Sequence, residues 1–85
     1  MTPDMIEKFI SEKIPSGAAV NIHFKDRSTV TGFFIHASDY EELKSKNFWR
    51  IVNHQHAEKW RASQDPGLSR LFNGASFTRL TEGEF

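Results

Sequence analysis

Two short stretches of the sequence combine positive charge with large aromatic rings. They are "KSKNFWR" (residues 44–50) and "EKWR" (residues 58–61). Stacking of an unpaired nucleic-acid base on an aromatic ring contributes about 1 to 3 kcal/mol to the binding free energy. Lys and Arg side chains contact the phosphates. The side chains that could act together in this way are Lys44, Lys46, Arg50, Lys59, Arg61, Trp49 and Trp60. They predict an interface for single-stranded nucleic acid.

The two tryptophans also have a purely structural interpretation. Trp49 stands beside Phe48 and Ile51 in a segment typical of a strand, where burial in the core is the usual fate of a tryptophan. Trp60 lies in a polar stretch. It either anchors that stretch onto the domain or stands exposed as a contact residue.

Charge is balanced over the whole chain but unevenly placed along it. Eleven basic and eleven acidic side chains give a formal net charge of zero, which argues against a general electrostatic attraction to nucleic acid. Residues 44–70 carry six basic and two acidic groups. This basic middle segment contains the predicted interface.

Other residue types offer weaker chemistry. His54 and His56 could present two imidazoles, but a metal site needs three or four ligands and the chain has no cysteine. Asp39, Glu41 and Glu42 could form a general acid and base pair, yet no nucleophile or phosphate-binding loop accompanies them. Adjacent acids after a strand more often form a solvated turn. We therefore expect no cofactor, no metal, no small-molecule substrate and no enzymatic activity.

The N-terminal segment has the pattern of an amphipathic helix over residues 3–14. Thr2, Pro3 and Asp4 form a typical helix start, with a capping hydroxyl, a proline at the first position and an acid near the positive end of the dipole. Apolar side chains then recur every three or four residues, at Met5, Ile6, Phe9, Ile10 and Ile14. This stripe predicts a helix packed on the rest of the domain.

The pattern then changes to the alternation typical of strands. We expect strands from residue 18 to residue 24, over residues 29–37 and 47–53, and over residues 69–72 and 75–81. Residues 38–42 form a polar break, and residues 54–67 form an irregular or short helical insertion. Gly32, in the second strand, predicts a bend or a close backbone approach. Both faces of that strand are apolar, so we expect the N-terminal helix to cover the face opposite the interior.

The sequence "LFNGASFTRL" (residues 71–80) places Asn73 and Gly74 between apolar residues. An Asn-Gly pair in this setting is the strongest short-range signal for a tight β-hairpin. The last two strands are therefore predicted to be joined by a turn at these two residues.

Length and composition place all these elements in one domain, residues 1–85. A chain of 85 residues has too little surface to bury for two cores. The fold class is α+β and mainly β: an N-terminal helix followed by a five-stranded, strongly bent antiparallel sheet or a small SH3-like barrel over residues 18–81. No apolar run reaches the roughly 18 residues needed to cross a membrane, and the absence of cysteine favours the cytoplasm.

Two segments resemble the signatures of the Sm and Sm-like proteins, which include the bacterial Hfq proteins. "VNIHFKDRSTVTGFFIHASD" (residues 20–39) is similar to the first signature. "LFNGASFTRL" is similar to the second signature. The residues that match the two patterns are Val20, Ile22, Phe24, Val30, Gly32, Phe34, Asp39, Leu71, Phe72, Gly74, Phe77 and Leu80. The same alternation is also expected of another SH3-like barrel or of a curved α+β sheet.

The resemblance implies a ring of subunits joined through their fourth and fifth strands, with single-stranded RNA bound by the two signature loops. In that pocket the family uses an aromatic ring and an asparagine after the aspartate, and a basic residue before the second glycine. Here Tyr40 supplies the ring one position early, Glu41 and Glu42 follow it, and Asn73 replaces the basic residue.

The sequence therefore predicts a non-enzymatic Sm-like binding module for single-stranded RNA. The predicted contact residues are Tyr40, Lys44, Lys46, Arg50, Trp60, Arg61 and Asn73. The alternative is a protein-interaction or structural module, whose partner is another protein or a second copy of the chain joined at a strand edge.

Overall fold

The N-terminal helix forms where its capping pattern predicts it. The computed structural model describes residues 1–15 and 17–83. Helix α1 (Pro3–Lys8) begins at Thr2, whose hydroxyl accepts a hydrogen bond from the Met5 amide. It continues as a π-helical turn over Phe9–Lys13, and the chain becomes extended at Ile14. The helix predicted for residues 3–14 is therefore present almost over its full length.

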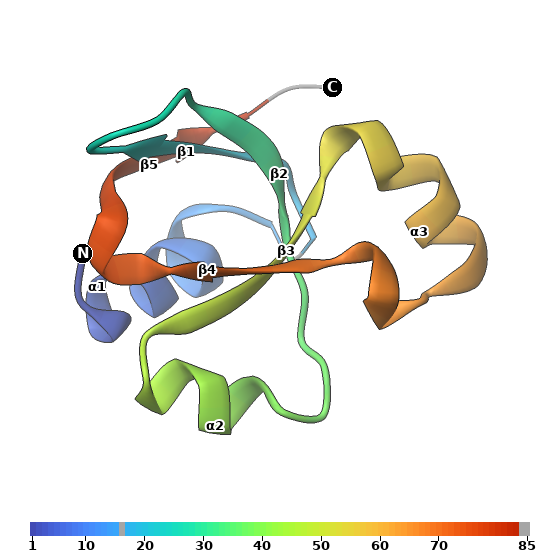
Figure 1. The fold of residues 1–85 in the computed structure, drawn as a ribbon, viewed down its shortest axis with the longest axis horizontal. Coiled ribbons are helices and arrows are strands. Elements are labelled where there is room, and N and C mark those ends of the chain that lie inside the picture. The colour runs from blue at the N-terminus through green and yellow to red at the C-terminus, as the bar shows by residue number, and fades with distance from the viewer. Residues whose placement is uncertain (16, 84–85) are drawn as a thin grey trace.

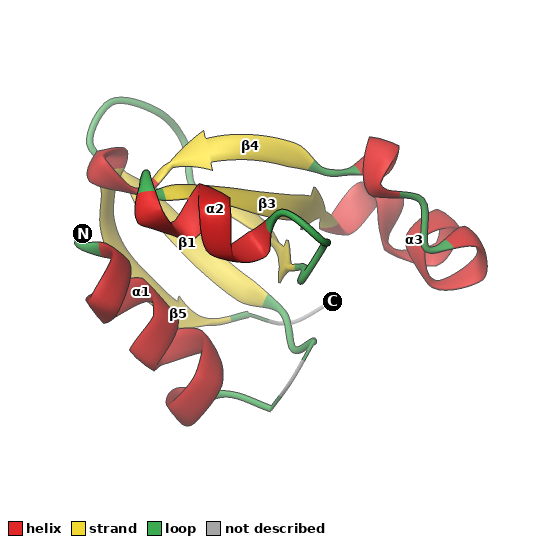
Figure 2. Ribbon diagram, turned by 90° about the horizontal axis from the view of Figure 1, so that it is seen from below, coloured by secondary structure: helices red, strands yellow, loops and turns green. Residues whose placement is uncertain are grey.

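Five strands form one antiparallel sheet, which confirms the α+β class and the sheet (Figures 1 and 2). They are β1 (Val20–Phe24), β2 (Val30–Phe34), β3 (Phe48–Asn53), β4 (Arg70–Asn73) and β5 (Phe77–Glu82). Their order across the sheet is β4-β3-β2-β1-β5. Within the described residues the end strands β4 and β5 do not pair with each other, so the sheet is open.

The predicted hairpin at Asn73 and Gly74 is wrong. Strand β4 pairs with β3, and β5 pairs with β1, so these strands occupy opposite edges although they follow each other in the chain. A single 3-10 turn over Gly74–Ser76 connects them, capped by the side chain of Asn73. Gly74 is required by packing, because a Cβ at this position would collide with the side chains of Asn47 and Ile6.

Asn47 organises this corner of the molecule. It has a positive φ of 62°, which Asn tolerates better than most residues. Its carbonyl oxygen accepts a hydrogen bond from the Gly74 amide at 2.8 Å, and its side-chain oxygen accepts one from the Trp49 indole at 2.8 Å. Asn47 therefore fixes the start of β3 against the turn between β4 and β5.

Gly32 brings two strands close together, as the sequence predicts. It lies in β2, opposite Asn53 of β3 and Val20 of β1. A Cβ at Gly32 would collide with the carbonyl oxygen of Val52. No larger residue fits this position without moving one of the two strands.

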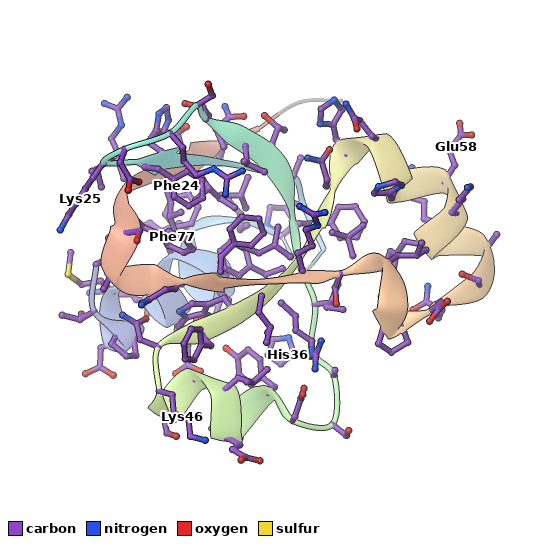
Figure 3. The ribbon with its side chains drawn as sticks, in the orientation of Figure 1. Phe24, Lys25, His36, Lys46, Glu58 and Phe77 are labelled. Carbon is purple, nitrogen blue, oxygen red and sulfur yellow. The ribbon has the colours of Figure 1, made fainter. Side chains whose placement is uncertain are left out.

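The main core lies between α1 and one face of the sheet. Ile6 and Ile14 come from the helical segment, and Trp49 and Phe77 are the largest of the fully buried strand side chains. In Figure 3, Phe77 and Phe24 lie close together inside the molecule, with their ring centroids 5.3 Å apart in an edge-to-face arrangement. Trp49 is only 1% exposed, so its interpretation as a core residue is confirmed.

A smaller cluster of buried apolar side chains covers the other face of the sheet. Phe33, Ile35 and Val52 pack there against Ala57 and Trp60 of helix α3 (Ala57–Ser63). The expectation that the N-terminal helix covers this face is wrong. Ala57 and Trp60 are three positions apart and therefore share one side of α3, which gives this helix an apolar surface for the sheet.

The connections contain more helix than the sequence predicts. The insertion at residues 54–67 consists of a 3-10 turn at His54–His56, helix α3 and a second 3-10 turn at Pro66–Leu68. Residues 38–42, predicted as a polar break, lead into helix α2 (Tyr40–Ser45). Figure 2 shows α1 and α2 on one side of the sheet, while α3 extends beyond the end of β3. No helix among the described residues has the length and apolar composition needed to cross a membrane.

Candidate nucleic-acid interface

Tyr40 and Lys44 of α2 converge on a carboxylate of α1. The Glu7 carboxylate accepts a hydrogen bond from the Tyr40 hydroxyl at 3.1 Å and one from the Lys44 ammonium at 2.8 Å. Lys44 also lies 3.0 Å from Glu41. Lys44 is therefore a neutralised cation that joins α2 to α1, and a phosphate would have to compete with two carboxylates for it.

The titration behaviour of this cluster follows from its contacts. The hydrogen bond from Lys44 lowers the pKa of the Glu7 carboxyl, although partial burial opposes the effect. Burial, with a smaller contribution from the hydrogen bond to Glu7, raises the pKa of Tyr40 to about 12. The hydrogen bonds to Glu7 and Glu41 raise the pKa of Lys44. Tyr40 therefore stays neutral and Lys44 stays charged at physiological pH.

Arg50 forms a two-pronged ion pair with Asp39. Its Nε donates to Oδ1 at 3.1 Å and its Nη2 donates to Oδ2 at 2.6 Å. The hydrogen bond from Arg50 lowers the pKa of the Asp39 carboxyl. Because the fork geometry of the guanidinium is used in this pair, Arg50 fixes the start of α2 to β3 and is not available to a phosphate.

Lys46 is more accessible to a ligand. Its ammonium lies 3.6 Å from the Glu42 carboxylate, and both side chains are largely exposed. An exposed pair of this kind contributes little to stability, so Lys46 can leave it at low cost. Figure 3 labels Lys46 at the end of α2.

Trp60 and Arg61 line a hollow between α3 and β2. The hollow measures about 330 Å³, and its walls include His36 and Phe33. Trp60 is half-buried with its ring centroid 6.4 Å from that of Phe33. The indole therefore anchors α3 to the sheet and presents only part of its surface to a ligand.

His36 connects this hollow to Tyr40. The imidazole is exposed and stacks on the Tyr40 ring, with the centroids 3.8 Å apart (His36 is labelled in Figure 3). His36 and Tyr40 line a further hollow of about 490 Å³ together with Glu7, Ile10 and Ser11. The structure thus brings Tyr40, Trp60 and Arg61 to two hollows that share His36.

Asn73 and Lys46 lie at the opposite end of β3 from α3. Asn73 is the partner of Phe48 at the start of β3, whereas α3 follows the end of that strand. A strand of six residues spans roughly 17 Å, so Asn73 does not reach Trp60. Its side chain caps its own turn by accepting a hydrogen bond from the Ala75 amide. The seven predicted contact residues therefore do not form one patch.

The acids that could form an acid and base pair each lie beside a cation in the structure. Asp39 pairs with Arg50, Glu41 with Lys44 and Glu42 with Lys46. No three His, Asp or Glu side chains among the described residues are arranged to hold a metal ion.

One cationic position away from the predicted interface has no signal in the sequence pattern. Arg27, in the β1–β2 turn, places its guanidinium 5.2 Å from the Phe24 ring centroid and 5.5 Å from that of Phe72. Residues 27 and 72 are far apart in the chain, so no local spacing could indicate this contact. The role of His36 is missed for the same reason, because only the fold places it between two hollows.

Comparison with known proteins identifies no relative: no family model matches the chain, and neither does any curated protein or solved structure. The resemblance to the Sm-like proteins stays a prediction based on the two signature segments.

Proposed function

We propose that the chain is a non-enzymatic binding module for single-stranded RNA. The observation that carries this proposal is the pair of hollows that share His36, one lined by Trp60 and Arg61 and the other by Tyr40. Unpaired bases stack on rings of these types, and sequence-tolerant binding of single strands depends on such rings beside cationic groups. A strand that crosses His36 would meet three rings in succession.

Few of the predicted cations are available, so we expect contacts with only a few phosphates of a bound strand. Lys44 and Arg50 are paired with carboxylates, which leaves Arg61 at the Trp60 hollow and Lys46, at the far end of β3, as the predicted cations that a phosphate could engage. Each phosphate neutralised on a single strand contributes about −0.7 to the slope of log K against log salt. Two contacts therefore correspond to a slope of about −1.4, so stacking supplies most of the expected affinity.

Fluorescence anisotropy of a short labelled single-stranded RNA tests the proposal at about 50 mM and about 200 mM salt. We expect binding at the lower salt concentration that is weakened by Arg61→Glu and by Trp60→Ala. Arg79→Glu is the matched control, because Arg79 is an exposed residue of β5 that lines neither hollow. Arg61 is exposed, so its substitution leaves the fold intact even if Trp60→Ala does not. Equal affinity of Arg61→Glu and Arg79→Glu, or no binding at the lower salt concentration, would overturn the proposal.

A second candidate function is the docking of another protein chain at the edge of the sheet. Phe48 and Leu71 are two of the three large apolar side chains that are exposed among the described residues. In the pairing of β3 with β4, Leu71 stands opposite Arg50, so Leu71 and Phe48 are diagonal neighbours on the same face. An exposed apolar pair beside an unpaired strand edge is typical of a surface that receives another strand.

Sedimentation of the chain at increasing concentration tests this second function for the case of a second copy. Joining of β4 to β5 of the next subunit, as the Sm-like resemblance implies, predicts a mass of several subunits that Leu71→Glu reduces. Thr78→Glu is a control for added charge at an exposed site of β5. A monomer at every concentration would remove self-association as a function of this edge.

A further inference from the structure

A separate cavity of about 350 Å³ lies where β2, β3 and β4 meet the helical insertion. Its walls come from the β1–β2 turn, from these three strands and from residues 55–56 and 67–69. It has no lining residue in common with the two hollows that share His36. Its volume is within the range of small-ligand sites, at the lower end.

The ionisable side chains that line this cavity are all of basic residue types. They are Arg27, Arg70 and His56, and no Asp or Glu lines it among the residues that the structure describes. Within the described residues neither Arg27 nor Arg70 lies within ion-pair distance of a carboxylate, in contrast to Lys44, Lys46 and Arg50. A recess lined by uncompensated cations attracts anions.

Arg27 contacts two aromatic rings, and its guanidinium donates no hydrogen bond to any other described residue. Its guanidinium packs near both the Phe24 and Phe72 rings, whose centroids are 5.7 Å apart. Contact with ring faces restricts the side chain while its N–H groups stay available. A guanidinium held in this way binds a phosphate or carboxylate with less loss of conformational freedom.

The remaining walls suit a flat ring with polar edges. Val30, Ile51, Leu68 and Phe72 supply apolar surface, and Asn53 and Gln55 supply side-chain amides. The Asn53 side-chain oxygen accepts a hydrogen bond from the Gln55 backbone amide, which fixes the orientation of the Asn53 amide group. Side-chain amides of this kind hydrogen-bond to the edges of nucleic-acid bases.

We infer that this cavity binds one nucleotide unit, with the base against the apolar wall and the phosphate at Arg27 and Arg70. The volume fits a single nucleotide better than a longer ligand. The nucleotide is either a free mononucleotide or one residue of a single-stranded RNA. The inference does not depend on the hollows around His36, because it uses none of their residues.

Isothermal titration calorimetry with a free mononucleotide and with a short single-stranded RNA tests the site and distinguishes the two sources. Arg70→Gln and the double variant Arg27→Gln/Arg70→Gln remove the proposed phosphate contacts. Arg70 is exposed and has no carboxylate partner within the described residues, so Arg70→Gln leaves the fold intact. Arg79→Gln is the matched control. Inorganic phosphate measures the contribution of the anion alone.

We expect the double variant to lose about tenfold or more in affinity, as is typical for hydrogen bonds to charged groups. A loss of affinity for the mononucleotide identifies a site for free nucleotides. A loss of affinity for the RNA alone identifies a contact with one residue of a single-stranded RNA. Amide NMR shifts at residues 55 and 67–70 would place either ligand in the cavity. The inference is overturned if the double variant binds both ligands as the parent does, or if neither ligand binds at about 1 mM.

A matched variant at the other site keeps this inference distinct from the proposed function. Arg61→Glu removes a cation from the hollow at Trp60 and leaves the nucleotide cavity unchanged. If Arg61→Glu weakens RNA binding and the double variant weakens the binding of neither RNA nor the mononucleotide, the proposed function stands and the nucleotide site is wrong. The opposite result would place RNA in the nucleotide cavity instead of the hollows around His36.

Discussion

Two regions of this small protein contain cationic and aromatic side chains, and their charges are arranged in opposite ways. In the region of α2 and β3, Lys44, Lys46 and Arg50 each lie beside a carboxylate. In the cavity between β4 and the helical insertion, Arg27 and Arg70 lie beside aromatic and apolar groups, and no carboxylate of the described residues lines the wall. The basic residues of the first region are closer together in the sequence. The second region nevertheless has more positive charge that no neighbouring carboxylate compensates in the fold. The availability of a cation for a ligand therefore depends on its neighbours in the fold.

The largest effect is expected from Trp49, which supports both regions. Its ring lies 6.0 Å from that of Tyr40 and its backbone pairs with Phe72. Trp49→Ala should lower the free energy of unfolding by about 3 to 5 kcal/mol, because it removes a fully buried ring. Urea denaturation measures the loss. Trp49→Phe should cost less, since it retains part of the packing, and equal stability of all three proteins would contradict the assignment of Trp49 to the core.

An intermediate loss of stability is expected when the pH is lowered. It should come from the ion pairs at α2, in which Glu7 and Asp39 supply the carboxylates. The folded pKa values of Glu7 and Asp39 are below their ordinary values of 4.5 and 3.8. Stability from these carboxylates is thus present above their unfolded pKa values and is lost as the pH falls through the folded values. Glu7→Gln/Asp39→Asn should flatten the dependence of the urea midpoint on pH below about 4.5.

The arginine-lined cavity provides the control for this pH dependence. Arg27→Gln/Arg70→Gln should keep the acid dependence of the parent protein, because neither arginine pairs with a described carboxylate. An equal flattening in both double variants would show that the two regions do not differ in this way.

A smaller effect is expected from the hydroxyl of Tyr40. Tyr40→Phe removes one hydrogen bond to Glu7 and should cost about 0.5 to 1.5 kcal/mol in urea denaturation. Because Tyr40 is the only tyrosine, ultraviolet absorbance of the phenolate reports its titration alone. The pKa should be about 12 in the folded protein, so the stability from the neutral ring is lost as the pH rises from about 10 to about 12. A phenolate that forms at the ordinary pKa of tyrosine would contradict the buried contact.

The smallest effect on stability is expected from Arg70→Gln. The side chain is exposed and has no carboxylate partner among the described residues, so the free energy of unfolding should change by no more than about 0.5 kcal/mol. Nucleotide affinity should nevertheless fall in this variant. A large loss of stability would show that Arg70 has a structural role.

The sequence predicts the elements whose periodicity is strong and local. The stripe from Met5 to Ile14 predicts the helical segment, and the alternation from Val20 to Phe24 predicts β1. Helix α2 is missed because Ser38, Asp39 and Glu41 also suit a solvated turn. This helix has only six residues and is held by tertiary contacts such as Tyr40 with Trp49.

The candidate sites were less predictable, because they depend on partners that are distant in the chain. Local composition identifies Lys44, Arg50 and Trp60 as cationic or aromatic, but it does not show that Arg50 meets Asp39 or that Trp60 meets Phe33. The error at Asn73 and Gly74 has a similar cause. An Asn-Gly pair that favours a hairpin in isolation is used here for a corner in which Gly74 packs against Ile6 and Asn47.

That corner has a mechanical consequence for the sheet. Three residues, Gly74–Ser76, are the whole connection between the edge strands β4 and β5. A shift of β4 along β3 would therefore also displace β5 along β1. A chain that lengthens the sheet at β4 would therefore also restrain β5. Amide hydrogen exchange should then slow in both β4 and β5, although the added chain contacts only β4.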